Sequence, residues 1–193
     1  MGSETSKGIP RRISMGHFGR YIRGATIDIG AGNDPMRKVI EGMSVRAWDW
    51  KDGDAQVLQG IQPQTFDTVY ASHSLEDMPD VVAALKRWSE IAKIGGCLYI
   101  IVPDFMLYEH GIWPSRYNEH HRHSFSLTIP RGMMNRETHW GPDEIEALFG
   151  DAGCTLEDKA IEDWNYDYGV KDNRDQTWGK AVAQMRLVAR RIR

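Results

Sequence analysis

The apolar run CLYIIVP, residues 97–103, places the tightest limit on what this chain can fold into. It contains no charged residue and includes β-branched ones, so it lacks the polar alternation of a half-exposed strand. Such a strand is typical of a parallel sheet covered by helices on both faces. Upstream, apolar residues recur at helical spacing and predict a helix over Pro79–Ile94, which Gly95-Gly96 is expected to end. A helix that leads into a buried strand indicates an α/β protein.

Strand and helix patterns alternate along the rest of the chain. The predicted strands are 25–30, 44–50 and 66–72, the further predicted helices are 34–42 and 142–153, and segments 154–163 and 180–191 are expected to pair antiparallel. This order predicts an α/β sandwich with a mostly parallel sheet and an antiparallel pair at its C-terminus. In such sheets, ligands bind beyond the carboxyl ends of the strands.

Composition and charge narrow the class of protein. The 193 residues carry a net charge of −3 and show no internal repeat, so one domain over 1–193 is expected, with 1–23 as an N-terminal extension. This charge gives no general attraction to nucleic acid or anionic membranes. No membrane span or signal peptide is recognisable, which predicts a cytoplasmic protein. Residues 1–8 are expected to be a flexible leader, the basic residues near both ends to be solvated, and Cys97 to be a buried free thiol.

Gly30 and Gly32 directly follow the first predicted strand, and two interpretations are open. They form either an ordinary turn or a place where the backbone closely approaches a ligand. A dinucleotide site would need a third glycine at position 35, which is Pro35, and Asp34 would repel a pyrophosphate there. A phosphate-free, cationic nucleoside such as S-adenosylmethionine (SAM) suits the turn better, with Asp28 near its ammonium group.

Two acids fall where a nucleoside would be held. Asp49 lies 19 residues after Gly30, at the end of the second predicted strand, where nucleotide-binding α/β proteins bind ribose hydroxyls. Asp54, in DGDA, could reach the adenine amino group. Either acid could instead be an exposed turn residue, because these sequences are also typical of turns.

The stretches TIDIGAGNDP, AWDW with DGDA, FDTVYASHSLEDM and RWSEIAKIGGCLYIIVPD together resemble class I SAM-dependent methyltransferases. The similarity is greatest to the small domains called type 11 and covers about residues 24–104. It implies a Rossmann-like methyltransferase sandwich, SAM as the cofactor, and methyl transfer as the reaction.

The resemblance also implies roles for individual residues. The glycine turn with Asp28 would bind the methionine part of SAM, Asp49 the ribose and Asp54 the adenine, while the end of strand 66–72 would close the site. The cofactor site that we expect comprises Asp28, Gly30, Ala31, Gly32, Asp49, Trp50, Asp54, Ala55, Ser72 and His73.

Two departures from the family pattern matter. The family often has LEH where this chain has LED, so a role of that histidine does not transfer to Asp77. Only sixteen residues separate Asp49 from Phe66, too few for a helix and a strand with their loops. We therefore expect one of these elements to be shortened or missing and the adenine pocket to be more open.

Residues 104–141 form a long stretch of weak periodicity that holds five of the seven histidines and many aromatic residues. Connections of this length are uncommon unless they are functional, and the aromatic content argues against disorder. We expect a lid that binds the acceptor substrate. Its sequence WPSRYNEHHRHSF resembles a WPSRxNxxHxHxF pattern of some small methyltransferases. The acceptor-binding residues that we expect are Trp113, Arg116, Tyr117 and Asn118.

Histidines of this insertion are candidates for a general base, which is useful when the acceptor is a hydroxyl or a protonated amine. His121 or His123 is predicted to fill this role, with His73 as a third candidate, and a surface or packing role is the alternative for each. Glu119 and His120, with the two neighbouring histidines, would also allow a metal site. Adjacent histidines often point apart and no HxxxH or CxxC pair supports them, so no metal is predicted.

These features together predict a SAM-dependent methyltransferase that modifies oxygen or nitrogen of a small-molecule or glycan-like acceptor. A non-catalytic module that binds SAM or S-adenosylhomocysteine and a metal-dependent hydrolase built on the histidines are the alternatives. Aromatic residues of loop 163–179 would contact an acceptor or a partner chain, or would pack as the end of a hairpin. No nucleic-acid or membrane partner is expected, and a homodimer is one option.

Overall fold

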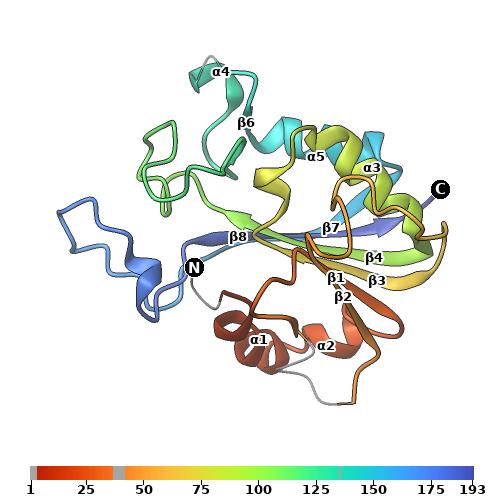
Figure 1. Ribbon diagram of the computed structural model, residues 1–193. Helices are drawn as coiled ribbons and strands as arrows, with labels where there is room; N and C mark the ends of the chain where they lie inside the picture. The colour runs from red at the N-terminus through yellow and green to blue at the C-terminus, as the bar shows by residue number, and fades with distance from the viewer. Residues whose placement is uncertain (1–3, 37–41, 135) are drawn as a thin grey trace.

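A six-stranded sheet runs through the middle of the computed structural model, which describes residues 4–36, 42–134 and 136–193 (Figure 1). The sheet order is β2-β1-β3-β4-β8-β7. Its strands are β1 Thr26–Ile29, β2 Val45–Trp48, β3 Phe66–Ser72, β4 Ala92–Pro103, β7 Cys154–Glu162 and β8 Gln184–Arg191. Strands β1 to β4 are parallel, whereas β8 runs antiparallel to both β4 and β7. The predicted α/β sandwich with its antiparallel C-terminal pair is confirmed.

Helices and short elements complete the fold. They are α1 Glu4–Ser14, α2 His17–Arg20, η2 Leu75–Asp77, α3 Val81–Ile91, β5 Ser124–Phe125, α4 Arg131–Met134, β6 His139–Trp140, α5 Pro142–Asp151 and η3 Gln176–Trp178. Helix α3 begins at a side-chain cap, because the carboxylate of Asp80 accepts the Ala83 N–H at 2.9 Å. Helix α5 begins with Pro142, whose fixed φ suits the first turn.

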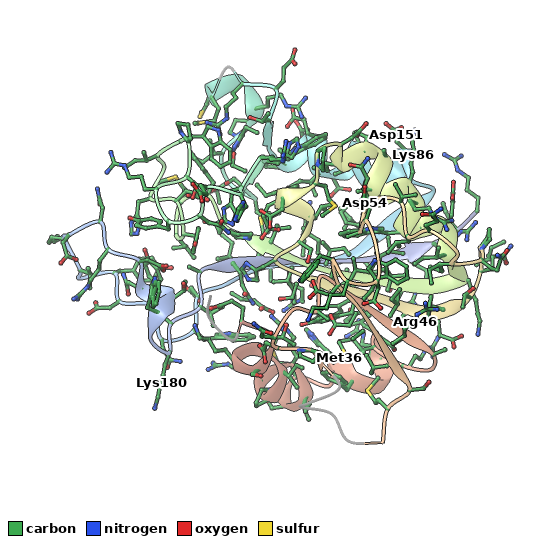
Figure 2. The ribbon with its side chains drawn as sticks, viewed as in Figure 1. Met36, Arg46, Asp54, Lys86, Asp151 and Lys180 are labelled. Atoms are coloured by element: carbon green, nitrogen blue, oxygen red, sulfur yellow. The ribbon has the colours of Figure 1, made fainter. Side chains whose placement is uncertain are left out.

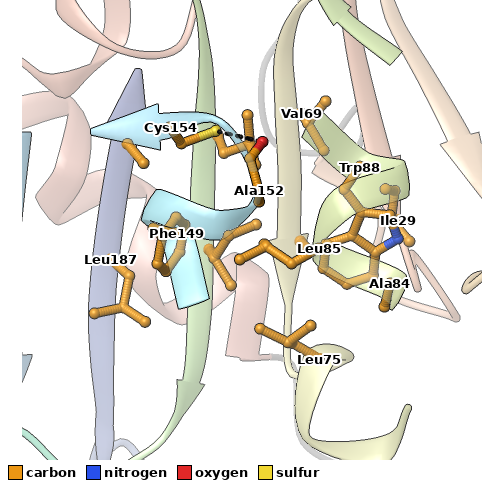
Figure 3. Packing of buried hydrophobic residues seen from close by; sticks show 14 of the residues in the cluster. Ile29, Val69, Leu75, Ala84, Leu85, Trp88, Phe149, Ala152, Cys154 and Leu187 are labelled. Atoms are coloured by element: carbon orange, nitrogen blue, oxygen red, sulfur yellow. Dashed lines mark hydrogen bonds between the residues drawn. The ribbon is translucent and has the colours of Figure 1, made fainter. Parts of the chain in front are cut away.

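One face of the sheet is covered by α3 and α5 (Figure 1). Trp88 of α3 lies beside Ile29 and Val69, and Phe149 of α5 lies beside Leu187, in one continuous buried cluster (Figure 3). The indole of Trp88 also donates to the carbonyl of Ala55 at 2.8 Å. Burying a large apolar side chain contributes about 2–3 kcal/mol, so this layer holds the helices firmly against the sheet.

The opposite face is covered by α1 and α2, and here two predictions from the sequence are wrong (Figure 1). Residues 4–8 are not a flexible leader, because they begin α1, in which Ile9 is buried. Nor are the basic residues near both ends uniformly solvated. Arg12 is 0% exposed and donates to Glu162 at 2.6 Å, and Arg186 donates to the same carboxylate at 2.8 Å. Burial is tolerated because each charge is paired.

Gly95-Gly96 does not end the helix as predicted. Helix α3 ends at Ile91, and β4 begins at once with Ala92, which pairs with Phe66 of β3. The pairing register then shifts, and Gly95 has a φ of +76°. The two glycines therefore accommodate an irregularity inside the strand, where a left-handed residue is needed.

The segment between β2 and β3 confirms the expected shortening. Residues 50–65 are all described, and they contain turns but neither a helix nor a strand. Strand β2 is consequently the edge of the sheet. The expected openness of the adenine side stays a prediction.

Three smaller points concern the remaining sequence features. Of the helix predicted over 34–42, residues 37–41 lie outside the described residues, and the carboxylate of Asp34 accepts the N–H of Ser6 at 2.8 Å. Cys97 and Cys154 are buried free thiols, as expected for Cys97. None of the helices in the described ranges has the length and apolarity needed to cross a membrane.

Candidate active site

The strand order changes direction at β1, because β2 adds to one side of it and β3 to the other. Ligands of open α/β sheets bind at this kind of switch point, beyond the carboxyl ends of the strands. Insertion 104–141 and loop 163–179 extend from the same end of the sheet (Figure 1). The turn after β1, the end of β3 and the insertion therefore form the candidate site.

The glycine turn after β1 needs its two glycines for different reasons. Gly30 has a φ of +73°, and a Cβ at this position would lie 1.8 Å from Oγ of Ser74. Ser74 holds that place by donating to the carbonyl of Ile29 at 3.0 Å. Gly32 has a φ of +49°, but a Cβ there would meet nothing closer than 3.9 Å. Gly30 therefore serves internal packing, whereas Gly32 leaves room for a ligand.

Asp28 and Ala31 hold this turn in place. Asp28 is buried, and its carboxylate accepts the N–H of Met36 at 2.7 Å, which ties β1 to the far end of the turn. The N–H groups of Gly30 and Ala31 donate to the carbonyl of Trp48 at 2.9 and 3.1 Å. The structure thus gives Asp28 an internal partner, and the predicted contact with the cofactor's ammonium group remains a prediction.

Asp49 and Trp50 lie at the carboxyl end of β2. The N–H of Asp49 donates to the side chain of Asp52 at 2.9 Å, which closes a tight turn. Within the described residues, the half-buried carboxylate of Asp49 makes no hydrogen bond, so its oxygens are free to accept from a ribose. The ring of Trp50 is 77% exposed and borders the same edge.

Asp54 and Ala55 belong to a turn on the α3 side of the sheet, and Figure 2 labels Asp54 there. Asp54 is exposed, and its side chain accepts the N–H of Gln56 at 2.8 Å. The backbone carbonyl of Asp54 accepts the N–H of Leu58 at 2.8 Å. The side chain and the backbone of Asp54 therefore both stabilise the turn that follows this residue. Ala55 is held by the indole of Trp88. Contact of either residue with adenine stays a prediction.

His73 directly follows Ser72, the buried last residue of β3, and its backbone is strained. The residue has a φ of +55°, which is uncommon outside glycine. Nε2 of its ring lies 2.8 Å from Oε1 of Gln184, whose Nε2 donates to Glu162 at 2.7 Å. The amide oxygen of Gln184 therefore accepts, and His73 carries its proton on Nε2. Burial lowers the pKa of His73, which favours the neutral ring.

His121 is the buried histidine of the insertion. Its Nδ1 lies 2.7 Å from Oε1 of Glu109, and the ring lies 5.3 Å from that of Tyr108. A carboxylate accepts hydrogen bonds, so Nδ1 of His121 is the donor to Glu109. The structure thus brings the predicted base His121 to the end of β3, where His73 lies.

Glu76 is the site residue that the sequence analysis missed. It is 1% exposed, and its Oε1 lies 3.6 Å from Nδ1 of His73 and 3.9 Å from Nε2 of His121. Burial and the neighbouring charge of Asp77 raise its pKa well above the ordinary value. Burial also raises the pKa of Asp77, which occupies the position of the family's histidine. The only signal in the sequence was its position, since Glu76 directly precedes Asp77, where the chain departs from the family pattern.

His123 occupies a packing position. Its Nδ1 accepts the indole N–H of Trp140 at 3.1 Å, and the ring centres lie 6.1 Å apart. Trp140 also stacks on the buried ring of Phe125. Burial lowers the pKa of His123. This arrangement supports the packing interpretation, and among the three predicted bases it leaves His121 and His73 beside Glu76.

The predicted acceptor-binding residues lie apart from one another. The guanidinium of Arg136 lies 4.7 Å from the ring of Trp113. Tyr117 contacts the ring of Tyr108 at 5.7 Å and reaches loop 163–179, where its hydroxyl donates to a backbone carbonyl. Asn118 accepts the N–H of His120 at 3.0 Å, and Arg116 is exposed. Trp113 and Tyr117 are both half-buried, but their rings contact different side chains.

The four residues considered for a metal have separate surroundings. His121 binds Glu109, His123 binds Trp140, and Glu119 and His120 are exposed. Across the described ranges, no three His, Cys, Asp or Glu side chains are grouped so that they could hold a metal ion. The arrangement gives no support to a metal-dependent hydrolase.

Comparisons with known proteins agree with this geometry. Residues 22–100 match the type 11 family model, which describes a methyltransferase domain. A comparison with curated protein sequences finds no match. Among solved structures, a Haloferax volcanii protein in complex with the Trm112 methyltransferase activator shares 15% identity, covering 99% of this chain and 94% of that chain, with a TM-score of 0.60.

Two further structures show how widely this fold is used. Burkholderia thailandensis 1,6-didemethyltoxoflavin-N1-methyltransferase, solved with 1,6-didemethyltoxoflavin and S-adenosylhomocysteine bound, shares 18% identity, covering 98% of this chain and 80% of that chain, with a TM-score of 0.59. The cyclase SpnF shares 14% identity, covering 93% and 80%, with a TM-score of 0.58. At these identities the likeness shows the fold alone. Residues 22–100 therefore match a methyltransferase domain of the type 11 family, and the chain around them has the fold of known methyltransferases.

Proposed function

We propose that this chain transfers the methyl group of SAM to an oxygen or nitrogen atom of a small-molecule or glycan-like acceptor. The observation that carries the proposal is the carboxylate of Asp49, which ends β2 without a hydrogen bond of its own in the described part of the chain. It lies beside a turn in which Gly32 leaves open space. A carboxylate at the end of the second strand is the group that holds ribose hydroxyls in related folds.

The residues present fit this cofactor along the edge of β1 and β2. Gly32 would allow close approach of the methionine part, and Asp28 would keep the turn in shape through Met36. Asp49 would bind the ribose, and the exposed ring of Trp50 offers the adenine a stacking surface. When bound, the cofactor supplies an activated methyl group on a sulfonium, so the protein mainly supplies alignment and desolvation.

Insertion 104–141 would hold the acceptor. It leaves the sheet directly after β4 and returns at β6 and α5, and its buried Glu109 and His121 lie at the end of β3. The half-buried rings of Tyr108 and Tyr117 contact each other beside them. Such a shell excludes water from the reacting atoms, which strengthens electrostatic interactions there.

His73 and His121 are the proposed proton acceptors, with Glu76 between them. Burial lowers the pKa of His73, which favours its neutral ring, and one nitrogen of each histidine lies within 4 Å of Oε1 of Glu76. A base with a pKa near neutrality accepts a proton most effectively at physiological pH. A cytoplasmic location and a homodimer remain predictions.

The second candidate function is binding of SAM or S-adenosylhomocysteine without methyl transfer. It is favoured by one specific observation, the absence of a helix or strand over the described residues 50–65, which leaves β2 as the edge of the sheet. Incubation with SAM labelled in its methyl group and a panel of acceptors separates the two functions. A pure binder saturates with SAM but releases no labelled product.

Calorimetry with S-adenosylhomocysteine tests the cofactor site. The natural chain should bind it, and Asp49→Ala should bind at least tenfold more weakly, because a charge-assisted hydrogen bond contributes about 1.5–3 kcal/mol. Asp151→Ala, which removes an exposed carboxylate at the end of α5, should bind like the natural chain. No heat with SAM or S-adenosylhomocysteine on well-folded protein would contradict the proposed function.

A further inference from the structure

Four ionisable side chains from two distant parts of the chain meet beyond the end of β3. His73 and Glu76 come from the segment that follows β3, and Glu109 and His121 come from the insertion. Nδ1 of His73 lies 3.6 Å, and Nε2 of His121 lies 3.9 Å, from the same Oε1 of Glu76, while Glu109 lies 2.7 Å from the other nitrogen of His121. We call these four residues the Glu76 cluster.

The Glu76 cluster contains more hydrogen-bond acceptors than donors. Both carboxylate oxygens of Glu76 and Oε2 of Glu109 are buried and have no hydrogen-bond partner among the described residues. Oδ1 of Asp77 and Oε2 of Glu4 are also buried without a hydrogen-bond partner among the described residues. Glu4 adds negative charge near His73. Buried polar atoms are nearly always paired in folded proteins, so this group of oxygens can accept hydrogen bonds from a bound ligand.

The positions of the ring protons sharpen this imbalance. His73 carries its proton on Nε2, which donates to Gln184, and His121 carries its proton on Nδ1, which donates to Glu109. The other two nitrogens, Nδ1 of His73 and Nε2 of His121, lie 3.6 and 3.9 Å from Oε1 of Glu76. These contacts are longer than hydrogen bonds, so the two rings do not satisfy the carboxyl oxygens of Glu76.

Nearby cationic side chains do not supply the missing donors. Arg12 donates to Glu162 and Tyr70, and Lys7 donates to Oε1 of Glu4 and to a backbone carbonyl. Within the described ranges, no lysine or arginine donates a hydrogen bond to any acidic residue of the Glu76 cluster. Among the described residues, the two histidines are therefore the only ionisable donors that contact the acidic side chains of the cluster.

We propose that the acceptor presents a protonated amine to the Glu76 cluster, so that the chain methylates nitrogen. This inference rests on the methyl-transfer function proposed above. An ammonium group brings a positive charge and up to three N–H donors to a place with three facing acceptors, whereas a hydroxyl brings one donor and no charge. The ring of Tyr108, 5.3 Å from that of His121, adds an aromatic surface of the kind that attracts cations.

The cluster also provides the proton acceptor that an ammonium needs before it can react. The carboxylate of Glu76 takes one proton from the ammonium, which frees the lone pair on nitrogen. Transfer then forms one N–C bond and breaks one S–C bond, whose electron pair stays on sulfur, and the product leaves as a methylated ammonium ion. The proton on Glu76 leaves through Nδ1 of His73 or Nε2 of His121. Burial raises the pKa of Glu76, which makes its carboxylate a stronger base.

Binding of paired probes to the protein saturated with S-adenosylhomocysteine tests the inference. Benzylamine, which is protonated at neutral pH, and benzyl alcohol have nearly the same shape, and both suit the aromatic insertion. Calorimetry should show that benzylamine binds at least tenfold more tightly than benzyl alcohol. Glu76→Gln should abolish this preference. The matched control is Glu119→Gln, which removes an exposed carboxylate of the same insertion and should retain the preference.

The other possible results contradict either the amine acceptor, the role of the Glu76 cluster, or the proposed function. Equal affinities for the two probes, or no binding of benzylamine, would overturn the amine acceptor, and this comparison needs no variant. A preference that survives both Glu76→Gln and His121→Asn would remove the cluster as its origin. A tenfold loss of S-adenosylhomocysteine binding in Glu76→Gln would assign the carboxylate to the cofactor's own ammonium group. Failure of the natural chain to bind S-adenosylhomocysteine would contradict the proposed function instead.

Discussion

The buried charges of this chain fall into two groups at the scale of single residues. Glu162 is paired with Arg12 and Arg186, and although burial would raise its pKa, these arginines hold the pKa below its ordinary value. Glu76 has no such partner, and burial raises its pKa. The first group stabilises the contact between α1 and the sheet, whereas the second destabilises the fold and marks the site.

This difference predicts how Glu76 affects stability at different pH values. The raised pKa means that folded Glu76 keeps its proton where the unfolded side chain, with an ordinary pKa of 4.5, releases it. The contribution of Glu76 to the free energy of unfolding is therefore fully present below about pH 4.5 and is lost as the pH rises toward the folded pKa. The free energy of unfolding falls by at most about 1.4 kcal/mol per pH unit over this range. Glu76→Gln cannot ionise, so its free energy of unfolding should increasingly exceed that of the natural chain as pH rises.

Urea unfolding at about pH 5, 6.5 and 8 measures this effect. His73 and Asp77 also titrate near Glu76, but they are present in both proteins, so the difference between the two isolates Glu76. Glu119→Gln should show no such trend, because Glu119 is exposed. A constant difference between Glu76→Gln and the natural chain would show that the carboxylate is ionised throughout.

The sequence could identify part of this site and not the rest. His121 and His73 were found because histidines are rare and were already candidates by type. Glu76 was missed because a glutamate beside a strand end is ordinarily exposed, whereas here it is buried and the insertion packs against its segment. Its role depends on contacts with residues 109 and 121, which no local pattern in SLED reveals.

At the scale of secondary-structure elements, the sequence predicted those elements whose residues show a clear local apolar pattern. Strand β3 lies at the predicted 66–72, because its residues are almost all buried. Helix α1 was missed, since it begins in polar residues and is held by Arg12, whose partner Glu162 is 150 residues away in the sequence. Gly95-Gly96 was misread because glycine is typical of both a helix end and a strand irregularity.

Removal of the buried arginine tests how α1 is attached. We predict that Arg12→Ala lowers the free energy of unfolding by about 3 kcal/mol, because it leaves Glu162 with one cationic partner fewer in a buried site. Arg11→Ala is the matched control, since Arg11 is exposed and lies 5.2 Å from the ring of Trp164. Its loss should stay below about 1 kcal/mol. Chemical denaturation measures both, and equal losses would show that α1 is not held by the buried pair.

At the scale of the whole molecule, the sheet extends differently on the two sides of the candidate site. Beyond β4 the sheet continues into β8 and β7, and insertion 104–141 extends from the end of β4 (Figure 1). On the other side the sheet stops at β2, and the described residues 50–65 add only turns. The same architecture serves a cyclase as well as methyltransferases, so the chemistry depends on these two sides of the site and not on the sheet.

An open edge makes one exposed ring important for cofactor binding. Trp50 is 77% exposed directly after Asp49, and stacking of a base on an aromatic side chain contributes about 1–3 kcal/mol. Trp50→Ala should therefore weaken S-adenosylhomocysteine binding about tenfold while changing the free energy of unfolding by less than about 0.5 kcal/mol. Trp178→Ala, which removes a ring 83% exposed on the distant loop, should leave the affinity unchanged. Calorimetry compares the two variants, and unchanged binding by Trp50→Ala would show that adenine is held elsewhere than along the free edge of β2.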